Sequence, residues 1–375
     1  KTFGASLGIA AIGLTLGFIY GGATGLAVTA ILAVLEVSLS FDNAVVNATV
    51  LVRMSPFWQK IFLTVGVAIA VFGMRLIFPL LIVGITAKLS PVEAVRLALE
   101  KGDPNQKGTY GYLLHAAHPA IAAFGGIFLL VLFLDFILEE REITWLSWLE
   151  RPLAKIGKLD QLSVVIALVA LAVSAYTLAP DDKVSTVLAS GILGLVTYLA
   201  VNGLGEFFEA EEEDVVEHMV GESHADAPKV KVPGGSKQMV QAVGKAAFFL
   251  FLYLEVLDAS FSFDGVVGAF AITSDPIVIA IGLGVGAMFI RSLTVYLVRK
   301  GTLAEYVYLE HGALWAIGAL AVLLLFTMKY NVPEVVTGLI GVGFIGAALV
   351  SSIVRNRREA TTDEAGGLDR EPAGV

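Results

Sequence analysis

The sequence contains no cysteine, which excludes disulfide bonds, thiolate metal ligands and cysteine nucleophiles. Charged residues make up only 16% of the chain, and the net charge of −9 gives no reason to expect a nucleic-acid partner. The sequence also lacks a phosphate-binding P-loop and the His-Glu-x-x-His helix of zinc proteases. We therefore expect neither an ATP-driven pump nor a hydrolase, and we predict that the protein is not an enzyme.

Apolar residues, by contrast, make up 57% of the chain, and the mean hydropathy is +0.80. They form runs of about twenty residues, which is the length that an α-helix needs to cross a hydrocarbon core of about 30 Å. We predict an all-α, polytopic transmembrane helix bundle of about ten spans, of which the first is a span and not a signal peptide. The apolar segments are 4–20, 24–51, 58–87, 115–138, 162–179, 184–203, 239–272, 276–298, 311–328 and 334–354.

The charges of the connecting segments predict the orientation of the chain. Lysine and arginine gather on one side, for example at Arg141, Arg151, Lys155 and Lys158, and are sparse on the other. By the positive-inside rule the basic side is cytoplasmic, so both termini lie in the cytoplasm. We expect a multi-pass protein of a bacterial or archaeal plasma membrane.

A polar, acidic segment lies between the sixth and the seventh of the ten apolar segments. We predict a first transmembrane repeat over 1–205, an acidic cytoplasmic linker over 206–238, a second transmembrane repeat over 239–355 and a disordered cytoplasmic tail over 356–375. The linker is either a solvated connection between the halves or a loose metal-sensing loop, and the sequence leaves both interpretations open.

The second and seventh segments carry similar acidic motifs. Glu36-Val-Ser-Leu-Ser-Phe-Asp42-Asn in the first half matches Asp258-Ala-Ser-Phe-Ser-Phe-Asp264-Gly in the second. Further matches follow in the next two segments: Gly66 and Arg75 with Gly282 and Arg291, and His118 and Gly125 with His311 and Gly318. Because the matched segments are five apart in the order of the spans, an odd number, they cross the membrane in opposite directions, and we predict two inverted-topology five-helix repeats, the plan of many secondary transporters with a midplane site.

Asn43 and Gly265 directly follow the second acid of each motif. Both residue types fit an unwound turn. In a continuous helix, positions six apart lie about 120° apart around the axis and do not converge on one ion. We therefore expect a local break in each motif helix.

Five acids lie inside these apolar runs, where an ionised carboxylate costs about 2.5–3.5 kcal/mol. Against them the spans offer Arg75 and Arg291, so negative charge is in surplus unless acids are protonated or a cation binds between them. Carboxylate, amide and hydroxyl oxygens suit Mn²⁺, Ca²⁺ or Mg²⁺. We predict a metal site made of Glu36, Asp42, Asn43, Glu255, Asp258 and Asp264, supported by Ser40, Asn47, Ser262, Arg75 and Arg291.

Two other interpretations apply to single residues of this set. Intramembrane acids can serve only to lock helices together through ion pairs, and we expect Arg75 and Arg291 to be structural partners of the acids, not substrate ligands. His118 and His311 lie near span ends, where a capping or interfacial role is the ordinary one. As matched residues they are also a possible proton relay.

The motif residues resemble the TerC/Alx family of integral membrane proteins, in the LysE transporter superfamily. The first family motif, a Glu followed after five residues by Asp-Asn-Ala, resembles Glu36 and Asp42-Asn43-Ala44. An arginine in the helix after each motif also resembles the family.

The second family motif has a Glu, an acid three residues on and another six beyond, and it is similar to Glu255, Asp258 and Asp264. The sequence departs from the family at Gly265, where members commonly carry Ser. The resemblance covers helices two to four and seven to nine. It implies manganese export, and the name of the family comes from tellurium resistance.

These observations predict a secondary transporter that exports a divalent metal cation, Mn²⁺ first and Ca²⁺ second, through a midplane carboxylate site. Export against an inside-negative potential of about 100 mV costs roughly 4.6 kcal/mol, and without ATP we expect proton-coupled antiport to supply it. The expected partners are the lipid bilayer, the metal ion and protons, with a homo-oligomer possible and no organic cofactor. Two alternatives stay open: an oxyanion carrier of the tellurite type that uses Arg75 and Arg291, and a non-transporting metal-binding scaffold of a resistance complex.

Overall fold

The computed structural model of the chain describes residues 3–66, 68–100, 105–159, 161–220, 242–273, 275–301 and 305–367. Within these residues the chain is helical and has no β-strand; one backbone bridge joins Met54 to Ala242. The helices of the first half are α1 (Gly4–Leu39), α2 (Phe41–Val52), α3 (Pro56–Ile61), η1 (Phe62–Gly66), η2 (Ile69–Ile77), α4 (Phe78–Thr86), α5 (Pro91–Leu99), α6 (Tyr110–Leu138), α7 (Ser147–Ile156), α8 (Leu162–Thr177), η3 (Asp181–Lys183) and α9 (Val184–Val220). Those of the second half are α10 (Gly244–Ile272), α11 (Pro276–Lys300), α13 (Leu309–Thr327) and α14 (Glu334–Gly367).

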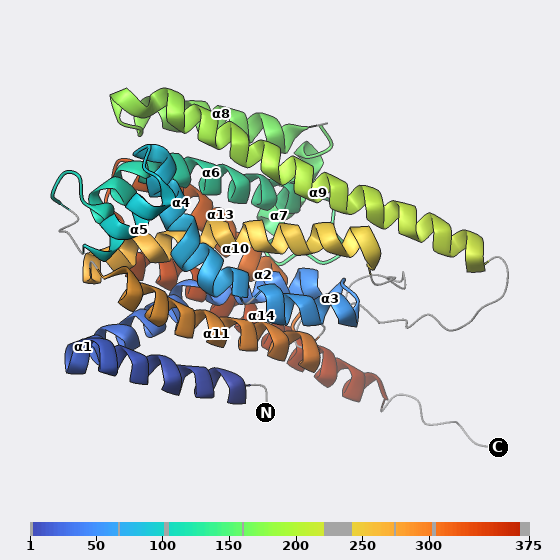
Figure 1. Cartoon of the computed structure of the whole chain (residues 1–375). Helices are drawn as coiled ribbons and strands as arrows, with labels where there is room; N and C mark the ends of the chain where they lie inside the picture. The colour runs from blue at the N-terminus through green and yellow to red at the C-terminus, as the bar shows by residue number, and fades with distance from the viewer. Residues whose placement is uncertain are drawn as a thin grey trace, which may run out of the picture.

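Long apolar helices make up a bundle whose members lie side by side (Figure 1). In the described residues, seven helical stretches are long and apolar enough to cross a membrane, so the chain is a multi-pass membrane protein. Each of the ten apolar segments predicted from the sequence contains a helix. The seven stretches do not include α10, and α8 and the apolar part of α2 are shorter than a full span, so the number of ten remains a prediction.

Helix α1 consists of two arms that fold back on each other (Figure 1). Gly22 at the fold has φ 62° and ψ −150°, a conformation open essentially to glycine alone. Gly17 and Gly25 lie where the arms touch, because a Cβ atom on Gly25 would overlap the carbonyl oxygen of Gly17. These glycines allow the first predicted span and the start of the second to form a tight helical hairpin.

The first acidic motif contains the helix break that we expected, although the break comes earlier. Helix α1 ends at Leu39, Ser40 has φ −100° and ψ 16°, and α2 begins at Phe41, so the interruption separates Glu36 from Asp42. The second motif has no such break. Helix α10 passes through Gly265 as a continuous helix, so the break that we expected after Asp264 is absent.

The stretch from Pro56 to Thr86 is unevenly wound in its described residues, 56–66 and 68–86. Between α3 and α4 it takes two π-helical turns, η1 and η2, in which backbone hydrogen bonds span five residues instead of four. π-Helical turns are rare in proteins, and a large share of those that do occur lie at functional sites. Here they carry Arg75, and they place backbone carbonyls next to both buried arginines.

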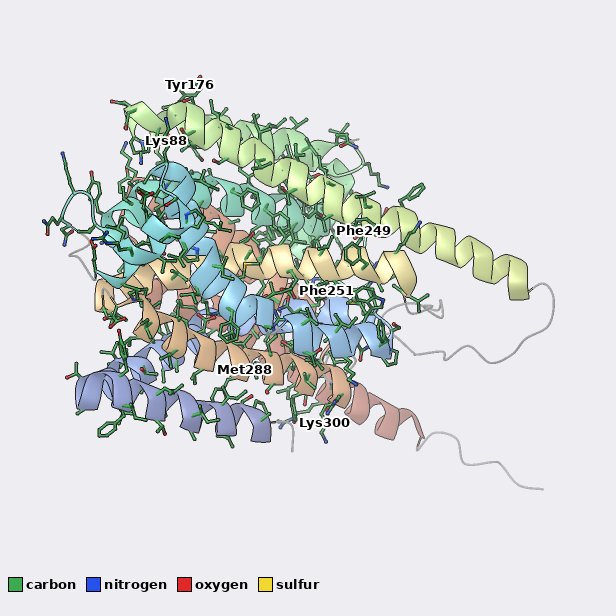
Figure 2. The ribbon with its side chains drawn as sticks, in the orientation of Figure 1. Lys88, Tyr176, Phe249, Phe251, Met288 and Lys300 are labelled. Carbon is green, nitrogen blue, oxygen red and sulfur yellow. The ribbon has the colours of Figure 1, made fainter. Side chains whose placement is uncertain are left out.

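The interior of the bundle is formed largely by α6, α11 and α13, whereas α1, α8 and α9 lie on its outside (Figure 1). The outer helices expose apolar side chains that a bilayer would cover. Ile19 on α1 is 73% exposed, and Tyr176 on α8, which points away from the bundle in Figure 2, is 74% exposed.

Small residues bring α11 and α1 together. A Cβ atom on Gly286 would overlap the Glu36 side chain and lie 2.8 Å from the Ala33 carbonyl oxygen. A Cβ atom on Gly282 would lie 2.6 Å from Leu32 Cβ. The two backbones therefore approach closely, as transmembrane helices do at small residues, and this packing holds Glu36 in the interior.

Two helices extend beyond the spans into segments that we assigned to the linker and the tail. Helix α9 continues to Val220, and α14 continues to Gly367. Alanine, glutamate and arginine in these extensions favour helix. Residues 221–241 of the linker region and 368–375 of the tail lie outside the described part of the chain.

Candidate functional site

The two acidic motifs contact each other in the interior of the bundle. Asn43 Nδ2 donates a hydrogen bond to Asp258 Oδ1 at 2.6 Å. At the matched positions, a Cβ atom on Gly265 would lie 3.1 Å from Glu36 Oε2. The Asn43 and Asp258 side chains are buried, at 2% and 4% exposure, so the contact lies away from the surface of the chain.

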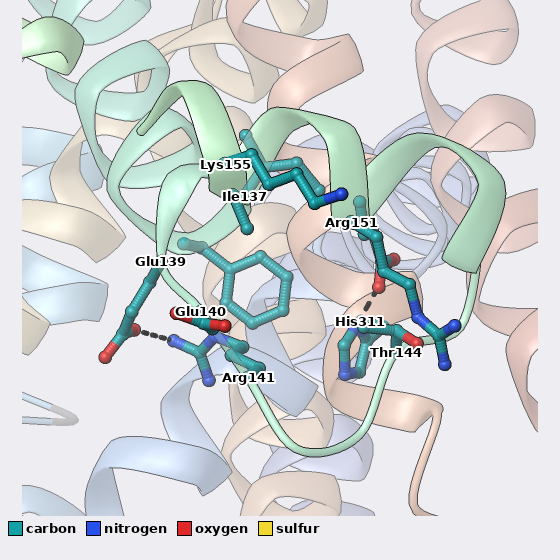
Figure 3. A pocket seen from close by; sticks show the side chains of 11 residues that line it. Ile137, Glu139, Glu140, Arg141, Thr144, Arg151, Lys155 and His311 are labelled. Atoms are coloured by element: carbon teal, nitrogen blue, oxygen red, sulfur yellow. Dashed lines mark hydrogen bonds and ion pairs between the residues drawn. The ribbon is translucent and has the colours of Figure 1, made fainter. Parts of the chain in front are cut away.

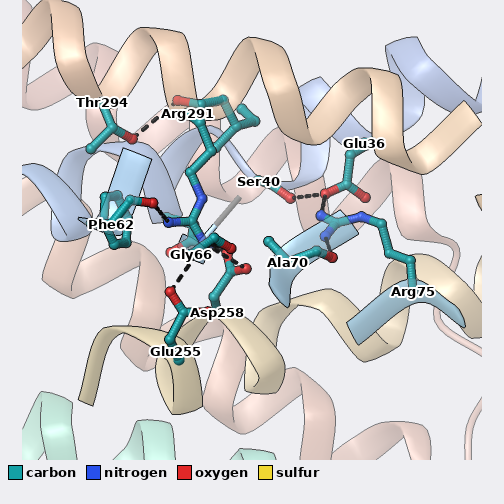
Figure 4. Close-up of polar contacts among 12 residues, drawn as sticks. Glu36, Ser40, Phe62, Gly66, Ala70, Arg75, Glu255, Asp258, Arg291 and Thr294 are labelled. Atoms are coloured by element: carbon teal, nitrogen blue, oxygen red, sulfur yellow. Dashed lines mark hydrogen bonds and ion pairs between the residues drawn. The ribbon is translucent and has the colours of Figure 1, made fainter. Parts of the chain in front are cut away.

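In the first motif, Glu36 forms a one-to-one ion pair with Arg75 (Figure 4). The Ser40 hydroxyl donates a second hydrogen bond to Glu36 Oε1 at 2.9 Å. Arg75 Nη1 donates to the Ala70 carbonyl oxygen five residues earlier, at the widened π-helical turn. All three side chains are buried, and the single negative charge of Glu36 faces a single positive charge.

In the second motif, Arg291 faces two carboxylates (Figure 4). Its Nη2 lies 3.4 Å from Asp258 Oδ2 and 3.6 Å from Glu255 Oε1. Its guanidinium also donates to the carbonyl oxygens of Phe62 and Gly66, both at 3.3 Å, and its Cζ lies 3.9 Å from the centre of the Phe62 ring. The π-helical stretch of the first half thus holds the arginine of the second half.

Two buried polar side chains on the motif helices have polar atoms without hydrogen-bond partners among the described residues. Neither carboxylate oxygen of Glu255 has a hydrogen-bond partner among the described residues, although Arg291 lies at ion-pair distance. Asn47, one turn after Asn43 on α2, is 1% exposed, and neither of its side-chain polar atoms has a partner there. Buried polar groups without partners are uncommon in proteins and cost free energy, so both positions call for a functional explanation.

Three predicted site residues cannot be placed at the level of side chains. The backbones of Asp42, Ser262 and Asp264 lie in α2 and α10, but their side chains lie outside the described part of the structure. Among the side chains that are described, no group of three or more carboxylates and imidazoles is arranged to hold a metal ion.

The structure shows no hydrogen bond or ion pair between the matched histidines, His118 and His311, and the described acids of the two motifs. His311, at the start of α13, is 5% exposed, and its Nδ1 lies 3.3 Å from Glu150 Oε1 on α7. Its ring contacts Phe136 edge-on, with 5.1 Å between the ring centres. His118 is partly buried in α6.

The sequence did not predict which backbone carbonyls accept hydrogen bonds from the two arginines, or that Glu150 is the partner of His311. The carbonyls of Phe62, Gly66 and Ala70 become available through π-helical winding, for which the sequence offers no signal beyond the matched Gly66. Glu150 lies in a short amphipathic helix between two spans, and the mixed polarity of residues 147–156 was the signal that could have pointed to it.

A family model described as a protein of unknown function, DUF475, matches residues 41–359. The chain belongs to the DUF475 family. The matched region includes both buried arginines and, apart from Glu36, all the acids predicted at the site. No curated protein and no solved structure matches this DUF475 chain.

Proposed function

We propose that this DUF475 protein is a secondary transporter that exports a divalent metal cation, with Mn²⁺ as the first candidate and Ca²⁺ as the second. The observation that carries the proposal is the contact between the two acidic motifs, made by Asn43 and Asp258 inside the bundle. The motif sequences also contain Asp42 and Asp264, so acids outnumber Arg75 and Arg291 in the sequence of this region. A cation or protons must compensate this surplus, because ionised carboxylates are costly in a bilayer.

The packing around the motifs supports inverted repeats. Gly66, in the helix after the first motif, packs on Phe251 and Glu255 of the second motif helix. Its match Gly282 packs on the first motif helix at Leu32 and Thr29. Each half therefore presents its matched glycine to the motif helix of the other half, as a pseudo-two-fold axis in the membrane plane requires. Many inverted-repeat transporters change access by moving one repeat or bundle against the other.

The donor set at the motif contact supports a hard cation as the substrate. Asp258 and the amide of Asn43 offer oxygen ligands there, which Mn²⁺ and Ca²⁺ accept, and we propose Asp42 and Asp264 as the further ligands. Protons would compete with the metal for these carboxylates and for Glu36, and an inward proton gradient would drive export. The motif residues resemble those of the TerC/Alx family, and we propose that the DUF475 chain is related to it within the LysE superfamily.

The runner-up is an oxyanion carrier that binds its substrate with Arg75 and Arg291. The geometry favours it less, because both guanidinium groups already face carboxylates and backbone carbonyls. A scaffold that binds metal without transporting it needs the same acids. Only a transport measurement separates the scaffold from the carrier.

The proposed location is a bacterial or archaeal plasma membrane with both termini in the cytoplasm. Lys88 and Lys300 lie at opposite ends of the bundle (Figure 2). Lys300 belongs to the lysine- and arginine-rich side that the positive-inside rule assigns to the cytoplasm, and Lys88 to the sparse side.

The test is Mn²⁺ movement across proteoliposomes that carry a pH gradient, followed with a trapped metal indicator. Asp42→Asn and Asp264→Asn should each abolish transport while the protein still elutes as a folded species. Asp135→Asn is the matched control, because Asp135 lies in the span α6 outside the motifs and accepts a hydrogen bond from Tyr198 at 2.7 Å. Full transport by both motif variants would contradict the proposal.

A second measurement, combined with the transport assay, separates the three candidate functions. Mn²⁺ or Ca²⁺ should raise the thermal unfolding temperature of the purified protein, whereas tellurite should not, because a ligand that binds only the folded state stabilises it by mass action. Stabilisation by tellurite alone would support the oxyanion carrier. Stabilisation by Mn²⁺ without any transport would support the scaffold.

A further inference from the structure

A pocket lies in the connection between α6 and α8, apart from the acidic motifs. It has a volume of about 250 Å³ and is lined on one side by α7 (Figure 3). The sequence places this connection on the basic side of the membrane. Glu150 and His311, both 5% exposed, contribute to its wall, and Arg151 and Lys155 line it from α7.

The buried acid of this pocket has no capacity left for a cation. Glu150 accepts hydrogen bonds from the backbone nitrogens of Trp145 and Leu146, at 3.0 and 3.2 Å, and from Trp315 Nε1 at 3.2 Å, in addition to His311. Burial by itself raises the pKa of Glu150, but the hydrogen bond and charge of His311, with the Leu146 and Trp315 bonds, outweigh it and lower the pKa. The carboxylate is therefore ionised and fully bonded.

The other two acids of the pocket each face a basic side chain. Glu139 Oε2 lies 2.6 Å from Arg141 Nη2, and Glu140 Oε2 lies 3.3 Å from Lys158 Nζ. Arg141 also covers the Phe136 ring, with its Cζ 4.1 Å from the ring centre. These contacts fix Arg141 in the wall of the pocket.

Arg151 and Lys155 differ from the other charged groups here. They lie one turn apart on α7, both are exposed, and both line the pocket (Figure 3). Among the described residues neither has an ion-pair or hydrogen-bond partner. An arginine fork and a lysine ammonium that line the same pocket offer the hydrogen-bond donors and the positive charge that a phosphate group needs.

The exposed face of α7 is suited to the membrane surface. Trp148 is 76% exposed and Ile156 is 52% exposed, and at helical spacing they share the outward face with Arg151 and Lys155. Exposed tryptophan beside basic residues, in a short helix between two apolar helices, is typical of the interface between head groups and acyl chains.

We propose that this pocket binds the phosphate of an anionic phospholipid head group, held between Arg151 and Lys155. The pocket accepts the head group, and the acyl chains extend along the exposed apolar side of α8, where Val169 is 59% exposed. Basic pockets beside transmembrane helices on the cytoplasmic side are established sites for acidic lipids. The site is independent of metal transport, because it shares no residue with the acidic motifs.

The test uses thermal unfolding of the purified full chain in a neutral detergent with added short-chain phosphatidylglycerol. The unfolding temperature should rise with this lipid and not with the same concentration of short-chain phosphatidylcholine. In the double variant Arg151→Gln/Lys155→Gln, the same rise should need at least a tenfold higher lipid concentration. The matched control is Arg299→Gln/Lys300→Gln, which removes two exposed charges at the end of α11 and should behave like wild type.

Two further arms make the result decisive. The variant Arg151→Lys/Lys155→Arg keeps both charges and should bind within about threefold of wild type, so a folding defect of the glutamine variant cannot imitate a lost site. Inorganic phosphate should have no effect at the lipid concentration. Equal stabilisation of the glutamine variant, an equal effect of phosphatidylcholine, or an equal effect of inorganic phosphate would each overturn the proposal.

Discussion

The two acidic motifs are similar in sequence but differ in their charge balance. In the first, Glu36 pairs one-to-one with Arg75, and a serine hydroxyl completes the contact. In the second, Arg291 faces both Glu255 and Asp258, at longer distances of 3.6 and 3.4 Å. One half therefore holds a closed ion pair, and the other holds a carboxylate in excess.

A single position explains this difference. Glu255 lies three residues before Asp258, and the residue three before the matching Glu36 is Ala33. The additional acid was accommodated without an additional cation, and neither of its oxygens has a hydrogen-bond partner among the described residues. The two halves thus share their helix packing, and the single difference between Ala33 and Glu255 changes the balance of buried charge. We expect the second motif to be the one that responds to protons or metal.

The largest effect should come from removing the arginines. Arg291→Gln leaves two buried carboxylates without their cation, whereas Arg75→Gln leaves one. Breaking a buried ion pair from one side costs about 3–5 kcal/mol, and we expect Arg291→Gln to lower the free energy of unfolding more than Arg75→Gln. Denaturant unfolding in detergent measures both, with Lys300→Gln as an exposed control on the same helix as Arg291. An equal loss in both arginine variants would mean that the second motif carries no excess charge.

The second-largest loss of stability should come from removing the contact between the motifs. Asn43→Ala removes a hydrogen bond to the Asp258 carboxylate, and hydrogen bonds to charged groups contribute about 1.5–3 kcal/mol. Asn47→Ala is the matched control, since Asn47 is equally buried on the same helix and forms no hydrogen bond within the described residues. The same unfolding experiment should show a loss for Asn43→Ala and little or none for Asn47→Ala. The reverse order would argue against the motif contact.

Helix packing against the motifs gives a third comparison. In Gly286→Ala the new methyl group meets the Ala33 carbonyl oxygen at 2.8 Å, and backbone cannot move aside easily. In Gly66→Ala it meets Glu255 Oε1 at 2.6 Å, the flexible end of a side chain. We expect a loss of about 1–3 kcal/mol for Gly286→Ala and a smaller one for Gly66→Ala. Gly343→Ala, with nothing within 4 Å, is the control for helix propensity, and an equal effect at all three positions would contradict the close approach.

The smallest effect should come from neutralising the excess acid. Glu255→Gln leaves Arg291 paired with Asp258 and removes a buried charge that accepts no hydrogen bond from the described residues. We expect the free energy of unfolding to stay within about 1 kcal/mol of the wild-type value or to rise. Glu36→Gln is its counterpart and should destabilise far more, because it strands Arg75. If both variants lose the same stability, the two halves are electrostatically equivalent.

Much of this architecture followed from the sequence. Apolar runs predicted a helical membrane bundle, since a bilayer leaves the backbone little choice but to satisfy its own hydrogen bonds. The spacing of Glu36, Asp258 and the two arginines indicated which helices belong to the site. In the structure these residues are buried together, with each arginine beside the acids of its own half.

Other features came only from the tertiary structure. The fold-back at Gly22, the π-helical carbonyls around Arg291 and the absence of a break at Gly265 are not encoded in any local pattern. They arise where one helix must fit against another. The same holds for the pocket at α7, whose wall brings Glu150 of one helix to His311 of another.

The sequence by itself determined that this chain enters a membrane and that its interior carries matched acids, because hydropathy and spacing are properties of the chain. Only the tertiary structure decided which acid faces which arginine and which acid is left over. Those outcomes depend on distances between different helices, and the contacts of Asn43 with Asp258 and of Arg291 with Phe62 join segments more than two hundred residues apart. Such distances are set by packing.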